Sequence, residues 1–301
     1  MVSSISRKEF LIRASGSVAL AASSASFAAE QLAATWQIGC YLRPWNQFEH
    51  TVALDAIAEA GFKYTGLLTT KSPNKFGITV NTTPEEAAAI GEECKEHGLG
   101  LPSAYGGDIP LDSIEAGIAG MRKLIDNCAT AGVANLMMGG VGTPELGEVY
   151  YKAIGESCAY AAEKGIGISV KPHGGTNATG PQCRALIEKV NQKNFRLWYD
   201  PGNIFFYSDG KLNPVDDAAT VDGLVVGMSV KDYREPKTVD VTPGTGMVDF
   251  PKVLARLKRG GFTSGPLIVE CLKPGTQAEL LEEAKKAFAF VTNLIASPGS
   301  T

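Results

Sequence analysis

The segment Lys164-Gly-Ile-Gly-Ile-Ser-Val-Lys-Pro-His173, written KGIGISVKPH, carries the pattern that decides the fold. A helical stretch ends at a glycine, a short apolar run follows, and polar residues follow the run. Glycine at this point adopts without strain the left-handed conformation that ends many helices. The same junction recurs at Ala60-Gly-Phe62, His97-Gly-Leu99, Ala131-Gly-Val133 and Gly260-Gly-Phe262. We therefore interpret the chain as a repeated unit in which a helix ends at glycine and a strand begins.

Eight short apolar runs alternate with longer segments of helical period. The predicted strands cover residues 36–42, 64–68, 101–105, 134–138, 166–170, 195–199, 225–230 and 266–269. These runs are continuous rather than alternating, which is typical of parallel strands with helices on both faces of the sheet. Eight β-α units in about 265 residues predict a (β/α)8 TIM barrel, with residues 29–301 as a single domain.

The intervening segments have the signals of helix ends. Helices are predicted at 83–96, 112–131, 144–164 and 277–295, the last with an apolar stripe at spacings of three and four residues. The alternative architecture, an open doubly wound sheet, would be expected to carry a glycine-rich phosphate turn after its first strand. Residues 38–45 contain no GxGxxG, so the barrel is favoured.

Residues 1–28 have the features of an export signal. Ser6-Arg-Lys-Glu-Phe-Leu11 resembles the twin-arginine motif with Lys8 in place of the second arginine, and an alanine- and serine-rich run follows. Ser26-Phe-Ala28 has the small-x-small pattern of a cleavage site. An amphipathic N-terminal helix would carry more charge. We expect a mature protein that begins near Ala29 and is periplasmic or secreted.

The charge balance excludes one class of partner. The predicted signal contains three of the 28 basic residues and one of the 32 acidic residues, which leaves 25 and 31, a net charge of −6. Nucleic-acid binding requires clustered cations, so this balance argues against it.

No later apolar run is long enough to span a bilayer, so no membrane contact is expected after signal removal. The six cysteines are scattered; a disulfide stays open in an exported protein, although buried thiols are the more usual state in a domain of this size.

Polar residues follow several of the predicted strands. In this type of barrel the carboxyl ends of the strands converge on one mouth, where the chemistry occurs. The fifth strand ends in Lys171-Pro-His173, the sixth in Tyr199-Asp-Pro-Gly-Asn203, the seventh in Ser229-Val-Lys-Asp232 and the eighth in Val269-Glu-Cys271.

The series YDPGN, SVKD, Pro243-Gly-Thr-Gly-Met-Val-Asp-Phe250 and GPLIVE resembles the sugar phosphate isomerase/epimerase family, which has a xylose isomerase-like TIM barrel. The resemblance implies one divalent ion, Mn, Mg or Zn, held by a glutamate, an aspartate, a histidine and a glutamate that end the fifth to eighth strands. It also implies that the two glutamates move a proton on either face of a sugar carbon.

This chain departs from that ligand set at two positions. Asp200 matches the aspartate and Glu270 matches the last glutamate, but Lys171 stands at the first glutamate and Ser229 at the histidine. The exchange of a carboxylate for an ammonium changes the local charge by about two units, which disfavours a dication. A metal ion held by Asp200, Glu270 and His173 therefore stays open but doubtful.

Lys171 allows three interpretations. Its ammonium replaces the ion between Asp200 and Glu270, or its pKa is lowered and it acts as a base or forms a Schiff base. The third is a structural salt bridge in a site without catalysis. His173 is interpreted as a contact to a substrate hydroxyl, a proton shuttle or a substitute ligand; His50 and His97 are expected to be structural.

Further side chains complete the predicted site. Asn203 and Lys231 are expected to contact sugar hydroxyls or a carboxylate, and Tyr105 and Trp45 to form, with Tyr41 and Arg43, an aromatic wall against a sugar face. Asp232 could equally be a loop cap, and the PGTG segment a loop that positions the next helix with Asp249 at its N-cap.

Two functions follow as hypotheses. The first is an exported isomerase, epimerase or lyase that transfers a proton next to a carbonyl on a sugar, keto-sugar or glycoside, with Glu270, Lys171 and His173 as catalytic residues. The alternative is a carbohydrate-binding barrel without metal or catalysis. The related DNA-repair endonucleases need many histidine ligands and a basic surface, and this chain has three histidines and is acidic. The sugar and any homo-oligomer stay open.

Overall fold

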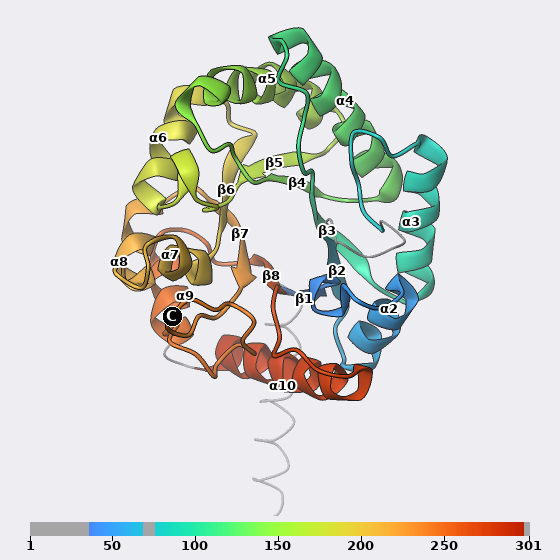
Figure 1. Cartoon of the computed structure of the whole chain (residues 1–301), viewed down its shortest axis with the longest axis vertical. Helices are drawn as coiled ribbons and strands as arrows, with labels where there is room; N and C mark the ends of the chain where they lie inside the picture. Colours follow the sequence, from blue (N-terminus) through green and yellow to red (C-terminus); the bar gives the residue numbers. More distant parts are fainter. Residues whose placement is uncertain (1–35, 69–75, 298–301) are drawn as a thin grey trace, which may run out of the picture.

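The computed structural model describes residues 36–68 and 76–297. The described residues form a closed ring of strands surrounded by helices (Figure 1). The predicted export signal, residues 1–28, lies outside the described residues. No helix within the described part of the chain is long and apolar enough to cross a membrane.

Eight parallel strands close the barrel in sequence order, which confirms the predicted (β/α)8 architecture. The ring closes where the first strand pairs with the last, with Cys40 opposite Val269. Each strand lies within two residues of its predicted bounds. The strands are β1 (Trp36–Tyr41), β2 (Tyr64–Leu67), β3 (Gly100–Tyr105), β4 (Asn135–Met138), β5 (Gly167–Val170), β6 (Phe195–Tyr199), β7 (Val225–Val230) and β8 (Gly265–Val269).

The helices begin and end at the signals in the sequence. Thr83 forms a capping box with Glu86, and Asp249 accepts a hydrogen bond from the backbone N–H of Lys252, as an N-cap does. The glycines at the five repeated junctions all have positive φ, between 69° and 103°. The α-helices are α2 (His50–Glu59), α3 (Pro84–Glu96), α4 (Ile114–Ala131), α5 (Pro144–Glu163), α6 (Gly180–Val190), α7 (Pro201–Tyr207), α8 (Pro214–Ala218), α9 (Phe250–Arg259) and α10 (Gln277–Ala296). Short 3₁₀ helices lie at η1 (Arg43–Trp45), η2 (Gly175–Asn177) and η3 (Ala219–Val221).

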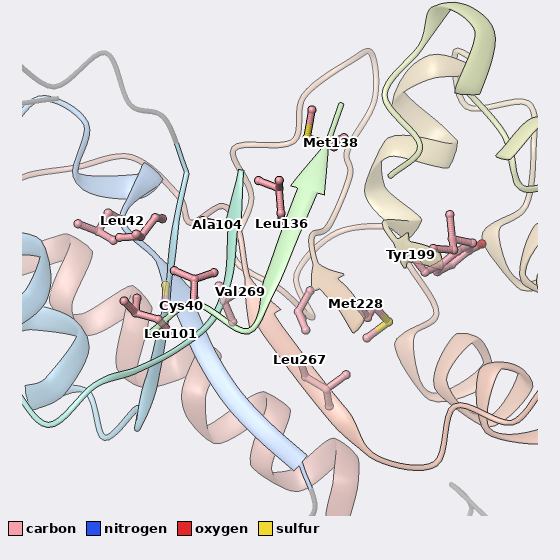
Figure 2. Packing of buried hydrophobic residues seen from close by; sticks show 14 of the residues in the cluster. Cys40, Leu42, Leu101, Ala104, Leu136, Met138, Tyr199, Met228, Leu267 and Val269 are labelled. Carbon is pink, nitrogen blue, oxygen red and sulfur yellow. The ribbon is translucent and has the colours of Figure 1, made fainter. Parts of the chain in front are cut away.

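Two hydrophobic clusters occupy the two sides of the strands. The larger cluster contains strand residues such as Leu136 and Val269 (Figure 2). It also contains residues of the surrounding helices. The smaller cluster consists of Tyr41, Met137, Trp198 and Ile268, which are fully buried. Its members alternate along the strands with members of the first, so they fill the barrel interior.

Two glycines make room for the large interior rings. A Cβ atom on Gly66 of β2 would lie 2.1 Å from the ring of Tyr41, and one on Gly227 of β7 would lie 2.4 Å from the ring of Trp198. Any larger residue at either position would displace a buried ring, so both glycines are required for packing.

Successive side chains of a strand point to opposite faces, and this alternation also determines which polar residues face the interior. Trp198 and Ile268 point inward, so Asp200 and Glu270, two residues further on, emerge on the same side. Lys171 and Lys231 follow the buried Ser169 and Ser229 in the same way. Four charged side chains from β5 to β8 therefore converge above the interior cluster.

All six cysteines are free and buried. Cys40 and Cys128 are fully buried, and burial raises the pKa of each thiol. They serve as small apolar residues of the core.

Candidate functional site

The centre of the site is an ammonium between two carboxylates. Nζ of Lys171 lies 2.7 Å from Oε2 of Glu270 and 2.8 Å from Oδ2 of Asp200. All three side chains are almost inaccessible to solvent. Lys171 donates a hydrogen bond to Glu270, whereas its contact with Asp200 is an ion pair without hydrogen-bond geometry. The sequence interpretation that placed the lysine between these carboxylates matches this geometry.

The two carboxylates keep Lys171 protonated. Burial alone would lower the pKa of the lysine, but Asp200 and Glu270 outweigh burial and raise the pKa above its usual value. A lysine that acts as a base or forms a Schiff base needs a lowered pKa. The geometry thus supports a fixed cation and does not support the nucleophilic interpretation of Lys171.

Glu270 has both oxygens fully engaged. Oε1 accepts hydrogen bonds from Arg43 at 3.0 Å and from Lys231 at 2.8 Å. Oε2 accepts from Lys171 and from the hydroxyl of Ser229, at 2.7 Å and 2.8 Å. Burial would raise the pKa of Glu270, but the three cations hold it well below its usual range. This carboxylate is an anchor for cations and a weak proton acceptor.

Asn203 connects the sixth and seventh strand ends. Its side-chain oxygen accepts a hydrogen bond from Lys231 at 2.9 Å, and its amide donates to the carbonyl oxygen of Pro172 at 2.6 Å. Its backbone N–H donates to Asp200, the N-cap of α7. Asn203 and Lys231 therefore lie in the site as predicted. Lys231 donates one N–H to Asn203 and one to Glu270, which leaves its third ammonium proton without a hydrogen-bond acceptor among these two residues.

The residues present do not fit a divalent ion at this place. Lys171 already lies at hydrogen-bonding distance from both carboxylates that match the family ligands, and its charge would repel a dication there. Ser229, at the position of the family histidine, donates to Glu270 instead. Within the described ranges, no group of three His, Cys, Asp or Glu residues is arranged to hold a metal. The ligand set of Asp200, Glu270 and His173 is not preformed among the described residues and stays a prediction.

His173 lies between two tyrosine rings. Its ring centroid is 6.1 Å from that of Tyr105 and 5.7 Å from that of Tyr207. Partial burial, and then the positive charges of Lys171 and Lys231, lower the pKa of His173 to about 4, so the imidazole is neutral at neutral pH. The side chain is nevertheless exposed. It can accept or donate a hydrogen bond to a ligand hydroxyl.

The other two histidines are structural, as expected from the sequence. His50 pairs with Glu93 at 2.8 Å and stacks on Phe76. His97 follows α3 and contacts Asp55 at 3.3 Å.

The aromatic wall predicted from the first strand is wrong for two of its members. Trp45 is 1% exposed and lines a small cavity with Leu42 and Phe76, so it packs in the core and does not face a substrate. Tyr41 is fully buried and hydrogen-bonded to Ser103 at 2.7 Å. Both side chains support the barrel from inside the fold.

The sequence analysis placed Arg43 in the aromatic wall and not in the ionic cluster, and it did not assign Tyr207 to the site. Arg43 follows the inward-facing Tyr41 by two residues. Because side chains two residues apart along a strand point to the same side, this spacing indicates that Arg43 also faces the barrel mouth. Tyr207 ends α7, seven residues beyond Asp200, and only the fold brings it to His173.

Asp232 is a loop anchor. Its carboxylate accepts hydrogen bonds from the backbone N–H groups of Tyr233, Gly244, Gly246 and Val248. Gly244 and Gly246 belong to the PGTG segment, whose N–H groups thus bind a carboxylate of the chain itself. These bonds hold the segment in place before α9, which it positions as predicted.

Comparisons with known proteins agree with the fold and the sequence pattern. A family model described as a xylose isomerase-like TIM barrel matches residues 54–294. No curated protein matches.

Solved structures of similar fold include several sugar epimerases. D-psicose 3-epimerase, solved in the presence of D-fructose, is 16% identical with a TM-score of 0.68 over 87% of this chain and 100% of that one. D-allulose 3-epimerase from Methylomonas sp., in complex with D-allulose, is 18% identical with a TM-score of 0.64 over 86% of this chain and 97% of that one. A xylose isomerase-like protein from Mycobacterium smegmatis in complex with magnesium is 17% identical with a TM-score of 0.68 over 87% and 99%. At these identities the likeness shows the shared fold.

Proposed function

Because this chain belongs to the xylose isomerase-like TIM barrel family, we propose that its barrel mouth binds a sugar and moves a proton next to the sugar carbonyl without a metal ion. The observation that carries this proposal is the ammonium of Lys171 between Asp200 and Glu270. The sequence likeness to an export signal adds the proposal that the enzyme acts outside the cytoplasm.

In this proposal Lys171 is the electrophile. An ammonium has three N–H donors; Lys171 donates one to Glu270 and lies at ion-pair distance from Asp200, so at least one N–H is left for a ligand oxygen. Loss of a proton from the neighbouring carbon places negative charge on the carbonyl oxygen. A cation that two buried carboxylates hold in place can stabilise that charge without reorganisation. The chain would thus supply from its own residues the positive charge for which other family members use an ion.

His173 is the proposed proton carrier. Glu270 accepts four hydrogen bonds and has a low pKa, so it is less suited to accept a proton. His173 is neutral at neutral pH, exposed, and flanked by the phenols of Tyr105 and Tyr207. We therefore propose that Glu270 fixes the cations and that His173 carries the proton.

Exchange of carbon-bound hydrogen tests this function. The protein, treated with a chelator, is incubated in D₂O with D-fructose, D-allulose and other ketoses and aldoses. We expect NMR to show deuterium at the carbon next to the carbonyl. His173→Gln should reduce the exchange at least ~100-fold, whereas His97→Gln on the barrel exterior should not change it. Exchange that requires added metal, or that survives in His173→Gln, would contradict the mechanism.

One observation favours a second candidate function, sugar binding without turnover. The single remaining family glutamate, Glu270, is saturated with donors, and the other glutamate is replaced by Lys171. In that case a sugar would bind with measurable affinity and no sugar in a broad panel would exchange hydrogen with D₂O. The same experiment therefore separates the two functions.

A further inference from the structure

The ionic cluster contains one cation that the buried charges do not balance. Lys171 and Lys231 together match Asp200 and Glu270 in charge, and these four side chains are at most 5% exposed. Arg43 also contacts Glu270, so the inner cluster carries one surplus positive charge. The next carboxylate, Asp240, lies 3.7 Å from Arg43 and is 56% exposed, so solvent weakens its attraction.

Arg43 also has unused hydrogen-bonding capacity. A guanidinium has five N–H donors in a planar fork. Among the described residues, Arg43 makes one hydrogen bond, from Nη1 to Oε1 of Glu270. Its side chain is 29% exposed, which places the unused part of the fork in reach of a ligand.

Lys231 lies beside Arg43. Both donate to Oε1 of Glu270, and each nitrogen is within 3.0 Å of that oxygen, so the two nitrogens are at most about 6 Å apart. Two cations at this separation repel each other. Each keeps at least one N–H beyond its bonds to Glu270 and Asn203.

Positive charge also acts on Tyr207, at the aromatic edge of the mouth. Burial raises the pKa of Tyr207, and among the charged groups Lys231 and Lys171 lower it more than Asp200 and Glu270 raise it. The cations therefore outweigh the carboxylates at the aromatic edge of the site as well.

We infer that the ligand of this mouth is a sugar acid, whose carboxylate is bound by Arg43 and Lys231. This inference rests on the proposed sugar-binding function and adds the substrate class. A carboxylate matches the planar fork of Arg43 in shape. It also matches the surplus of one positive charge, which a phosphate dianion would exceed. Binding at this place removes the repulsion between the two cations.

Binding of matched acid and neutral sugars tests the inference. Titration calorimetry at low ionic strength would compare D-glucuronate with D-glucose, D-galacturonate with D-galactose, and both acids with D-glucose 6-phosphate. We expect at least one acid to bind ~10-fold more tightly than its neutral parent and more tightly than the phosphate, with a preference that decreases as salt rises.

Variants assign the preference to Arg43. Arg43→Gln should reduce the ratio of acid to neutral affinity to within ~2-fold, and Arg43→Lys should retain part of it. Asp240→Asn should increase acid affinity by ~2-fold or more, because it removes the exposed carboxylate that lies beside Nη2 of Arg43 and competes with a ligand for it. Arg122→Gln, on the exterior helix α4, should leave the ratio unchanged. Asp240→Asn keeps the test decisive if Arg43→Gln does not fold.

Three results would overturn the inference: no acid binds, a neutral parent binds as tightly as its acid, or the preference persists in folded Arg43→Gln. Tighter binding of the phosphate would also reject a carboxylate ligand. Hydrogen exchange separates this outcome from failure of the proposed function. Acid preference without exchange rejects the catalytic proposal alone, and exchange without acid preference rejects this inference alone.

Discussion

The ammonium of Lys171 lies 2.7 Å from Oε2 of Glu270, inside a barrel where both side chains are at most 3% exposed. A pair this deeply buried is stable only because further partners satisfy both groups. Glu270 also accepts hydrogen bonds from Arg43, Lys231 and Ser229. Lys171 also forms an ion pair with Asp200. The cluster is therefore one interdependent unit, and its parts cannot be removed singly without a large cost.

Replacement of Lys171 should destabilise the fold strongly. Lys171→Met keeps most of the side chain but removes the ammonium that lies 2.8 Å from Asp200. We expect the free energy of unfolding, measured with urea, to fall by ~3–5 kcal/mol. Lys152→Met, at an exposed i,i+4 pair with Glu156, is the control and should cost under ~0.5 kcal/mol. A loss below ~1 kcal/mol in Lys171→Met would show that the buried pair is not coupled as described.

Restoration of the two family ligands should create a metal site. Lys171→Glu with Ser229→His removes the blocking ammonium and adds a carboxylate and an imidazole beside Asp200 and Glu270. We expect calorimetry to detect one Mn²⁺ per chain in the double variant and none in the natural chain, because hard oxygen ligands and one imidazole suit this ion. Equal Mn²⁺ affinity in the two proteins would contradict the assignment of Lys171 to the ion's place.

Asp232 should determine the conformation of the loop before α9. Asp232→Ala leaves the backbone N–H groups of Tyr233, Gly244, Gly246 and Val248 without their acceptor. We expect a loss of at least ~3 kcal/mol in urea unfolding. Asp249→Ala, which removes one N-cap bond, should cost ~1 kcal/mol. If the two variants lose the same amount, Asp232 does not hold the loop as described.

The pH dependence of stability should contain a contribution from His173. Its pKa is lowered to about 4 in the folded chain and is ~6.5 when unfolded. The unfolded state therefore binds more protons between these values, and stability should decrease as the pH falls from ~6.5 to ~4. Thermal melting across this range should show a smaller decrease in His173→Gln than in the natural chain. An identical decrease in both proteins would mean that His173 stays accessible to protons in the fold.

The sequence was sufficient for the barrel. Apolar runs between glycine-ended helices predicted all eight strands, and the end of each strand marked the mouth. The loss of a glutamate at Lys171, beside the retained Asp200 and Glu270, led to an ammonium between carboxylates as one of three interpretations, and the structure was needed to choose among them.

Other parts of the site depend on packing between distant segments. Trp45 looked like a substrate contact because it follows the first strand, yet a 3₁₀ turn carries it into the core. The capture of the PGTG backbone by Asp232 depends on the path of one loop. Arg43 could have been assigned by its inward parity after Tyr41, but its link to Glu270 needs the closure of β1 on β8.

If Lys171 takes the place of a metal ion in this barrel, the purified natural chain should hold no ion there, and metal analysis measures this. The chain is purified without chelator, its Mn, Mg and Zn content is measured, and its melting temperature is recorded with and without added Mn²⁺ and EDTA. We expect far less than one ion per chain and no change in melting temperature with either addition. One ion per chain, with a melting temperature that EDTA lowers and Mn²⁺ restores, would contradict it.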